Sequence, residues 1–150
     1  LLQHARQDLL VDAWFAASRH WAVAFHFNKG LAGATPNVRA ASSETSINPQ
    51  VLDAFALAII AGNGPSSYPG LMPRPDVADA RRHARSISLA MKALRVAAPE
   101  AGSYLSECDY FMKNWQSASW GSHYPRLLRI KHRYDPHNIF SVHHGVNIQI

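Results

Sequence analysis

The sequence predicts a mixed α+β fold, because both helical and strand periodicities occur along the chain. Apolar residues between positions 3 and 19 recur at three- and four-residue steps, which is the spacing of one helix face. From Trp21 to Phe27 they alternate instead, as in a half-buried strand. With 150 residues and 47% hydrophobic composition, the chain has the size and balance of a globular domain.

The charge and hydropathy of the chain exclude two classes of partner. Fifteen basic against ten acidic residues give a net charge of +5, but the basic residues are dispersed and no nucleic-acid motif accompanies them. No apolar run approaches the roughly 20 residues that cross a bilayer. We therefore expect no nucleic-acid partner and no membrane span. Because the chain starts at Leu1 with a mixed, charged helix, we expect a fragment or processed chain without a signal peptide.

The middle of the chain predicts two further helices around a loop. Asn48-Pro49 is a helix-start signal, since Asn caps free N–H groups and proline fits the first helical position. This helix is expected to reach about Ala61 and, being apolar nearly all round, to be buried on several sides. Residues 62–75 are rich in Gly, Pro and Ser and predict a loop. The next helix is expected over residues 76–97. Its predicted inner stripe consists of Val77, Ala80, Ala84, Ile87, Met91 and Leu94.

The last third predicts a short strand, an aromatic stretch and a terminal helix. The strand is expected over Ser103–Glu107. Ser122 is expected to cap the terminal helix, and Asp135-Pro136 to stop it. Leu127, Ile130 and Tyr134 would repeat on one face of that helix.

The segment from Trp120 to Phe140, WGSHYPRLLRIKHRYDPHNIF, resembles the C-terminal signature of the berberine-bridge-enzyme-like oxidases. These are flavoproteins of the vanillyl-alcohol-oxidase type. The family pattern is aromatic-Gly-x-Asn-Tyr/Phe, then Arg-Leu, Lys and Tyr-Asp-Pro-x-Asn-x-Phe. Four upstream stretches are similar to its isoamyl-alcohol-oxidase-like branch: residues 27–33, 48–61, 67–70 and 101–107.

The resemblance implies a place for this chain in a larger architecture. Residues 1–100 would be the later half of an antiparallel-sheet substrate domain, and 101–150 the berberine-like segment that packs on an FAD-binding domain of the PCMH type. That domain is not in this chain, which has no Gly-rich pyrophosphate loop. The implied partners are the FAD-binding N-terminal domain or large subunit and a small-molecule substrate. FAD would be held mostly by the missing domain.

The resemblance also implies an activity. A hydroxylated small molecule, an alcohol or a sugar, would give hydride to FAD, and oxygen would reoxidise the flavin to yield hydrogen peroxide. A secreted or periplasmic location is implied as well. The alternative from another class is a non-catalytic small subunit that completes a two-chain flavoprotein. An extensive exposed apolar patch around Phe55, Ile59 and Trp120 would favour that alternative.

Two residues are the candidate catalytic groups, because alcohol oxidation needs a proton acceptor for the hydroxyl. Tyr104 lies where the family places active-site residues, and its alternative is a buried tyrosine with a satisfied hydroxyl. Glu107 would have a raised pKa in a covered site, and its alternative is a surface carboxylate. Strand alternation would separate the two unless the strand ends or bulges near Ser106.

Four residues are the candidate cofactor contacts. His123 occupies the position of the family's near-flavin Asn, a departure that still allows donation to a flavin carbonyl. Trp120 and Tyr124 flank it, with simple packing as their alternative. His144 falls near the Gln of the family's closing motif. A metal site at His143-His144 is not expected, because no HExxH or paired-cysteine spacing supports it and strand neighbours point to opposite faces.

Overall fold

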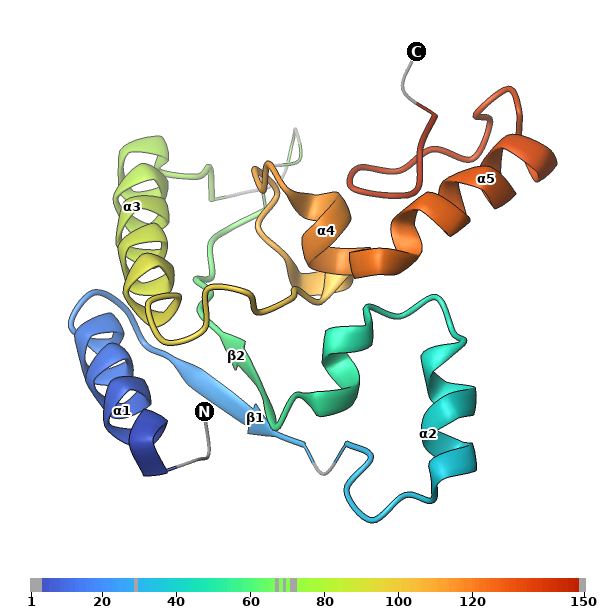
Figure 1. Ribbon diagram of the computed structural model, residues 1–150. Coiled ribbons are helices and arrows are strands. Elements are labelled where there is room, and N and C mark those ends of the chain that lie inside the picture. The colour runs from blue at the N-terminus through green and yellow to red at the C-terminus, as the bar shows by residue number, and fades with distance from the viewer. Residues whose placement is uncertain (1–3, 29, 67, 69, 71–72, 149–150) are drawn as a thin grey trace. The chain divides into compact units, whose positions relative to one another are not determined.

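The chain combines helices with an antiparallel two-stranded sheet, so the predicted mixed α+β class is found (Figure 1). The computed structural model describes residues 4–28, 30–66, 68, 70 and 73–148. They form two compact units, each built from two stretches of chain. The first unit holds Leu1–Phe27 with Ala56–Glu100, and the second holds Asn28–Phe55 with Ala101–Ile150. The assignment of 1–100 and 101–150 to parts of a larger protein stays a prediction.

The first unit is two helices and the sheet. Helix α1 covers His4–Ser18 and α3 covers Val77–Leu94. Strand β1, Ala24–Phe27, pairs antiparallel with β2, Ala56–Ile59. Gln3, the predicted start of the first helix, lies outside the described residues. The core cluster consists of Ala17, Ile60, Ala90 and Leu94. Two of these are alanines with 0% exposure, one from each helix, so small side chains allow α1 and α3 to pack closely.

The predicted helix from Asn48 to Ala61 is wrong beyond its first turn. A 3-10 helix, η1, covers Pro49–Asp53, Ala54 is extended, and β2 follows. The start signal itself is confirmed, because the Asn48 side chain accepts a hydrogen bond from the Gln50 amide. An apolar run without clear periodicity fits a buried strand as well as a buried helix. Pairing with β1, which no local pattern reveals, decides in favour of the strand.

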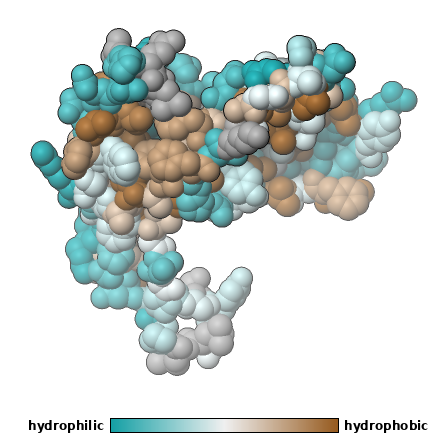
Figure 2. All heavy atoms as spheres, turned by 90° about the horizontal axis from the view of Figure 1, so that it is seen from below, coloured by the Kyte–Doolittle hydropathy of each residue, from teal (hydrophilic) through white to brown (hydrophobic). Residues whose placement is uncertain are grey.

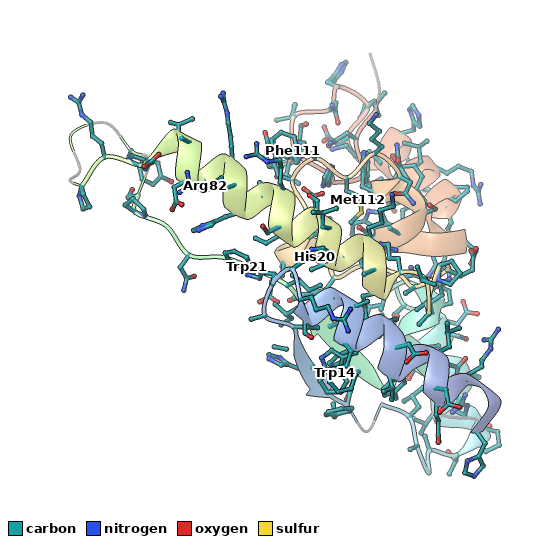
Figure 3. All side chains as sticks on the ribbon, turned by 90° about the vertical axis from the view of Figure 1, so that its left-hand side faces the viewer. Trp14, His20, Trp21, Arg82, Phe111 and Met112 are labelled. Atoms are coloured by element: carbon teal, nitrogen blue, oxygen red, sulfur yellow. The ribbon has the colours of Figure 1, made fainter. Side chains whose placement is uncertain are left out.

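Helix α3 is confirmed, although its inner face differs from the predicted stripe. The Asp76 carboxylate caps it by accepting from the Asp79 amide at 2.9 Å. Ile87 and Met91 pack on the core, but Val77 and its neighbours one and two turns on, Ala80 and Ala84, are exposed. The N-terminal half of α3 extends beyond α1 (Figure 3), and there Trp21 packs against His83 with ring centroids 4.8 Å apart.

The second unit is made of short helical elements. Helix α2 covers Pro36–Ser43, 3-10 helix η2 covers Leu105–Glu107, α4 covers Trp115–Trp120, η3 covers Gly121–His123 and α5 covers Tyr124–Tyr134. The predicted strand Ser103–Glu107 is therefore wrong, because its backbone closes a turn at η2 instead of extending. No helix among the described residues is long and apolar enough to span a bilayer.

The sequence predicts the C-terminal end of α5 correctly but not its N-cap. Asp135 stands at its C-cap, so the predicted stop is confirmed. Ser122 is not its cap, because η3 precedes the helix directly and His123 takes the N-cap position without a side-chain hydrogen bond. Of the predicted apolar face, Ile130 is 43% and Tyr134 76% exposed. That face is therefore largely open in the described part of the chain.

Candidate functional site

The predicted cofactor residues Trp120, His123 and Tyr124 lie around the junction of α4, η3 and α5. Gly121 forms this junction with φ +55°, a backbone conformation that L side chains rarely adopt. The Trp120 indole Nε1, the His123 Nδ1 and the Ser119 hydroxyl are buried without a hydrogen-bond partner among the described residues. Three unsatisfied polar atoms in five residues are costly, at about 1–3 kcal/mol each. This segment therefore favours a polar partner.

Aromatic contacts connect His144 to the same junction. The Trp115 ring meets the Tyr124 ring edge-on, with centroids 5.5 Å apart, and stacks on the His144 ring at 5.5 Å. Burial raises the pKa of the Tyr124 hydroxyl. The structure thus brings all four predicted cofactor residues into one part of the second unit. Their role at a cofactor stays a prediction.

His144 is held from several sides in a left-handed conformation. His144 is 6% exposed and has a φ angle of +59°. The Cys108 Sγ lies 3.6 Å from its Nδ1, and the same thiol donates to the Leu105 carbonyl at 3.2 Å. The tail is a turn here, since the Gly145 amide donates to the Val142 carbonyl at 3.0 Å. The sequence singled out neither Cys108 nor this turn.

The expectation that His143 and His144 point to opposite faces is wrong. It assumed a strand, whereas the turn places the two rings 3.9 Å apart. The His143 ring also stacks on Tyr110 at 3.8 Å, and its Nε2 is 2.6 Å from the Tyr110 carbonyl oxygen. The described residues contain no group of three or more His, Cys, Asp or Glu side chains arranged to hold a metal ion.

The two predicted catalytic residues lie beside each other on a turn. Tyr104 precedes η2 and Glu107 ends it, with the Glu107 amide donating to the Tyr104 carbonyl at 3.1 Å. The objection that strand alternation separates them therefore falls away. Both side chains are exposed, Tyr104 by 53%. In the described chain, Glu107 therefore has the exposure of a surface carboxylate, which was its alternative, and its place in a covered site stays a prediction. The Tyr104 alternative of a buried, satisfied hydroxyl is excluded within the described chain.

Asn48 is the residue of this site that sequence reasoning placed too locally. It was predicted only as a helix cap, yet it is 2% exposed and its Nδ2 donates to the Ala118 carbonyl at 2.8 Å, 70 positions away. The Asn48-Pro49 dipeptide indicates a helix start, but it carries no information about a contact with α4.

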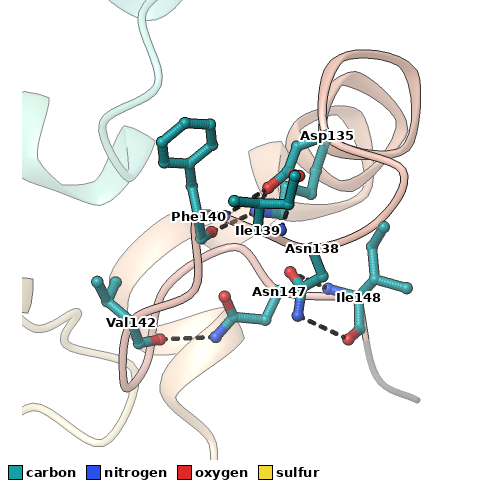
Figure 4. A network of polar contacts seen from close by, with 8 residues as sticks. Asp135, Asn138, Ile139, Phe140, Val142, Asn147 and Ile148 are labelled. Atoms are coloured by element: carbon teal, nitrogen blue, oxygen red, sulfur yellow. Dashed lines mark hydrogen bonds and ion pairs between the residues drawn. The ribbon is translucent and has the colours of Figure 1, made fainter.

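A network at the end of α5 fixes the tail that carries His144 (Figure 4). The Asp135 carboxylate accepts from the Ile139 amide at 2.8 Å, from the Phe140 amide at 2.9 Å and from Lys131 Nζ. Asn138, in a left-handed conformation, exchanges hydrogen bonds with the backbone of Ile148 at 3.3 and 3.4 Å. We call this network the tail clasp. It makes Asn138 a turn residue.

Residues 103–147 match the family described as berberine and berberine like. The match covers 45 of the 150 residues of the chain. The berberine-like segment contains the whole α4–η3–α5 junction and His144. All six predicted site residues fall inside it.

Several relatives of the chain are FAD-linked oxidoreductases from fungi. An uncharacterized FAD-linked oxidoreductase from Arthroderma benhamiae is 37% identical over 65 residues, 43% of this chain and 12% of that protein. A VAO-type flavoprotein oxidase from Thermothelomyces thermophilus is 39% identical over 54 residues, 36% of this chain and 9% of that protein. The FAD-linked oxidoreductase notD' from Aspergillus versicolor is 51% identical over 49 residues, 33% of this chain and 8% of that protein.

The matched part is thus about a tenth of the length of these relatives. No solved structure matches the chain. The resemblance to a berberine-like, VAO-type family is confirmed at this level, whereas the isoamyl-alcohol-oxidase-like branch stays a prediction.

Proposed function

We propose that this chain is part of an FAD-dependent oxidoreductase and that the berberine-like segment supplies one side of its flavin site. The observation that carries the proposal is the match of residues 103–147 to the berberine-like family. The shared name of the relatives, FAD-linked oxidoreductase, gives the chemistry. Most of the FAD would be bound by a domain or subunit outside this chain, since the match is confined to a small share of each relative.

The residues at the α4–η3–α5 junction fit a flavin ring chemically. An indole N–H at Trp120 and a hydroxyl at Ser119 are donors, and the His123 imidazole is a donor or an acceptor according to its tautomer. Carbonyl oxygens and ring nitrogens of a flavin are their complements. All three polar atoms are covered by the chain itself, so this contact requires a side-chain adjustment at the junction.

FAD would supply the redox step by accepting hydride from the substrate. This chain's own task is then to position the substrate and to accept a proton. Tyr104 and Glu107 are the proposed groups, because one directly precedes η2 and the other ends it, and both are residue types suited to taking a hydroxyl proton. The finer proposal is an alcohol or sugar substrate with oxygen as acceptor, hydrogen peroxide as product and a secreted or periplasmic setting.

A second candidate is a non-catalytic small subunit that completes a two-chain flavoprotein. Phe55, Ile59 and Trp120, the patch expected for that case, are each only partly exposed. Another apolar surface favours it instead. Trp14 meets Phe25 edge-on at 4.7 Å and Phe25 stacks on Phe27 at 6.1 Å, while Phe27 is 73% exposed.

The proposal is tested by purifying the chain from its native source and recording its visible absorbance spectrum and its co-purifying chains. We expect a flavin spectrum together with an FAD-binding polypeptide or covalently continuous domain. Trp120→Phe, which keeps the ring but removes the N–H, should lower the flavin content relative to the control Trp21→Phe in the first unit. A colourless, monomeric chain would remove the enzyme function from it.

A further inference from the structure

Asn48 is the most completely buried large side chain that the structure describes. A buried amide is costly unless both its oxygen and its nitrogen are hydrogen-bonded. Helix capping uses only the oxygen, which accepts from the Gln50 amide at 3.1 Å. The buried side-chain nitrogen of Asn48 therefore has a role other than helix capping.

The nitrogen of Asn48 is directed at the carbonyl end of α4. Its Nδ2 donates to the Ala118 carbonyl at 2.8 Å and lies 3.4 Å from the Ser117 carbonyl. The Ala118 carbonyl also accepts from the Ser103 amide at 2.8 Å. One amide thus joins the start of η1 to the last turn of α4, directly before Trp120.

Two glycines allow this approach, one on each side. A Cβ at Gly121 would lie 2.6 Å from the Asn48 oxygen, and a Cβ at Gly102 would lie 2.8 Å from its nitrogen. Both distances are too short for any real side chain, so these sites are shaped around the Asn48 amide. Gly121 directly follows Trp120 and lies two positions before His123, and its backbone direction sets where both side chains project.

We infer that Asn48 is a positioning residue, whose amide fixes the backbone from which the Trp120 indole and the His123 imidazole reach a ligand. The inference rests on the proposed function for the identity of that ligand as a flavin. The positioning itself is a property of this chain. It is measured without any cofactor.

Three variants separate positioning from capping. Asn48→Ser keeps a good cap acceptor but is too short to reach the Ala118 carbonyl. Asn48→Asp keeps the shape and the cap but replaces the donor with a carboxylate that faces two carbonyls. Asn48→Ala removes both functions. The matched control is Asn28→Ser, because the exposed Asn28 side chain accepts a local hydrogen bond from the Gly30 amide at 3.0 Å.

The readouts are nuclear magnetic resonance signals of the full chain. They are the Trp120 indole N–H, assigned with Trp120→Phe, the pH titration of the His123 ring, and the exchange rate of the Ser103 amide. At neutral pH, where Asp135 is charged, the Ile139 and Phe140 amides of the tail clasp serve as the internal reference for folding.

We expect all three Asn48 variants to shift the Trp120 and His123 signals and to speed Ser103 amide exchange on the order of fivefold. Asn28→Ser should leave them unchanged. In Asn48→Asp alone, the wild-type signals should return at low pH, because burial beside carbonyls raises the pKa of the new carboxyl and its protonated form is again a donor. A merely structural role would not give this selective, reversible recovery.

Wild-type signals in Asn48→Ser would show that Asn48 is only a cap and would overturn the inference. Loss of the Ile139 and Phe140 signals in all three variants would overturn it too, since the role would then be general folding. Absence of flavin from the purified wild-type chain would instead defeat the proposed function and leave these shifts as the measure of positioning.

Discussion

Asp135 shows how one side chain fixes the segment that carries a candidate site residue. Asp135 is 9% exposed, and its carboxylate accepts from Lys131 and from two successive tail amides. The Lys131 ammonium, followed by the Phe140 and Ile139 amides, holds the pKa of Asp135 below its usual range. The tail that leads to His144 therefore depends on the charge of one carboxylate.

The tail clasp is predicted to open at acid pH. Because the pKa of Asp135 is lowered in the folded chain, its stabilising effect is fully present above the ordinary aspartate pKa of about 4. It is lost as the pH falls through the lowered value. Exchange of the Ile139 and Phe140 amides, corrected for the intrinsic pH dependence of exchange, should therefore accelerate below about pH 4.

Asp135→Asn is the matched variant for this prediction. It keeps one acceptor oxygen but loses the charge that Lys131 and the amides share, so both amides should already exchange faster at pH 7. The additional acceleration at acid pH should disappear. The same acid response in Asp135→Asn and in the wild type would assign the effect to another group.

At the residue scale, the sequence predicts which residues lie at the candidate site, but not their contacts or their burial. Trp120, His123 and Tyr124 were predicted from a local signature, and they do lie at one junction. The second contact of Asn48, the pairing of Cys108 with His144 and the orphaned Ser119 hydroxyl were not predicted. Each of these three features depends on burial or on a residue many positions away. A local sequence pattern predicts neither burial nor a distant partner.

Among the elements, α3 offers the clearest test of a predicted core position. Its inner face includes Leu94, which the sequence predicts and which is 7% exposed in the core cluster, and Ala90, which lies outside the predicted stripe. Leu94→Ala should lower the free energy of unfolding by about 2–5 kcal/mol, through lost burial and a cavity. Denaturant unfolding followed by circular dichroism measures this change.

Leu89 provides the control within the same helix. It is 50% exposed, so Leu89→Ala should change stability by no more than about 0.5 kcal/mol. Equal losses for both leucines would mean that the inner face of α3 is not the one described. A small loss at Leu94 alone would mean that the site collapses around the shorter side chain.

The elements that sequence reasoning predicted are those with a period or a punctuating residue. Helix α3 has a 3.6-residue period, α1 carries apolar residues at three- and four-residue steps, and Asp135-Pro136 marks the end of α5. Strand β2 was mistaken for helix because its register with β1 is a non-local choice. The strand expected at Ser103–Glu107 became η2, where the Cys108 thiol bonds back to the Leu105 carbonyl. The five residues 103–107 have no strong period, so the sequence does not distinguish a strand from a 3-10 helix there.

At the scale of the whole molecule, several exposed or partly exposed aromatic side chains contact one another and form a continuous row. In the first unit, ring contacts connect Trp14, Phe25 and Phe27, and Trp14 and Phe27 are 40% and 73% exposed. Figure 2 shows hydrophobic side chains gathered on the left of the view, over the α1 and β1–β2 part of this unit. Contiguous apolar surface of this kind is typical of a surface that another part of a protein covers.

The chain by itself is therefore predicted to bind the hydrophobic dye ANS while remaining folded. Phe27→Ser should reduce the dye fluorescence, because it breaks the aromatic row at its most exposed member, and should leave the helical circular dichroism unchanged. Val96→Ser is the matched control, since Val96 is 64% exposed and lies outside the row. Sedimentation at several concentrations distinguishes dye binding by the monomer from binding by aggregates. Equal fluorescence from Phe27→Ser and the wild type would show that the row is not the dye-binding surface and that its exposure gives no reason to expect a covering partner.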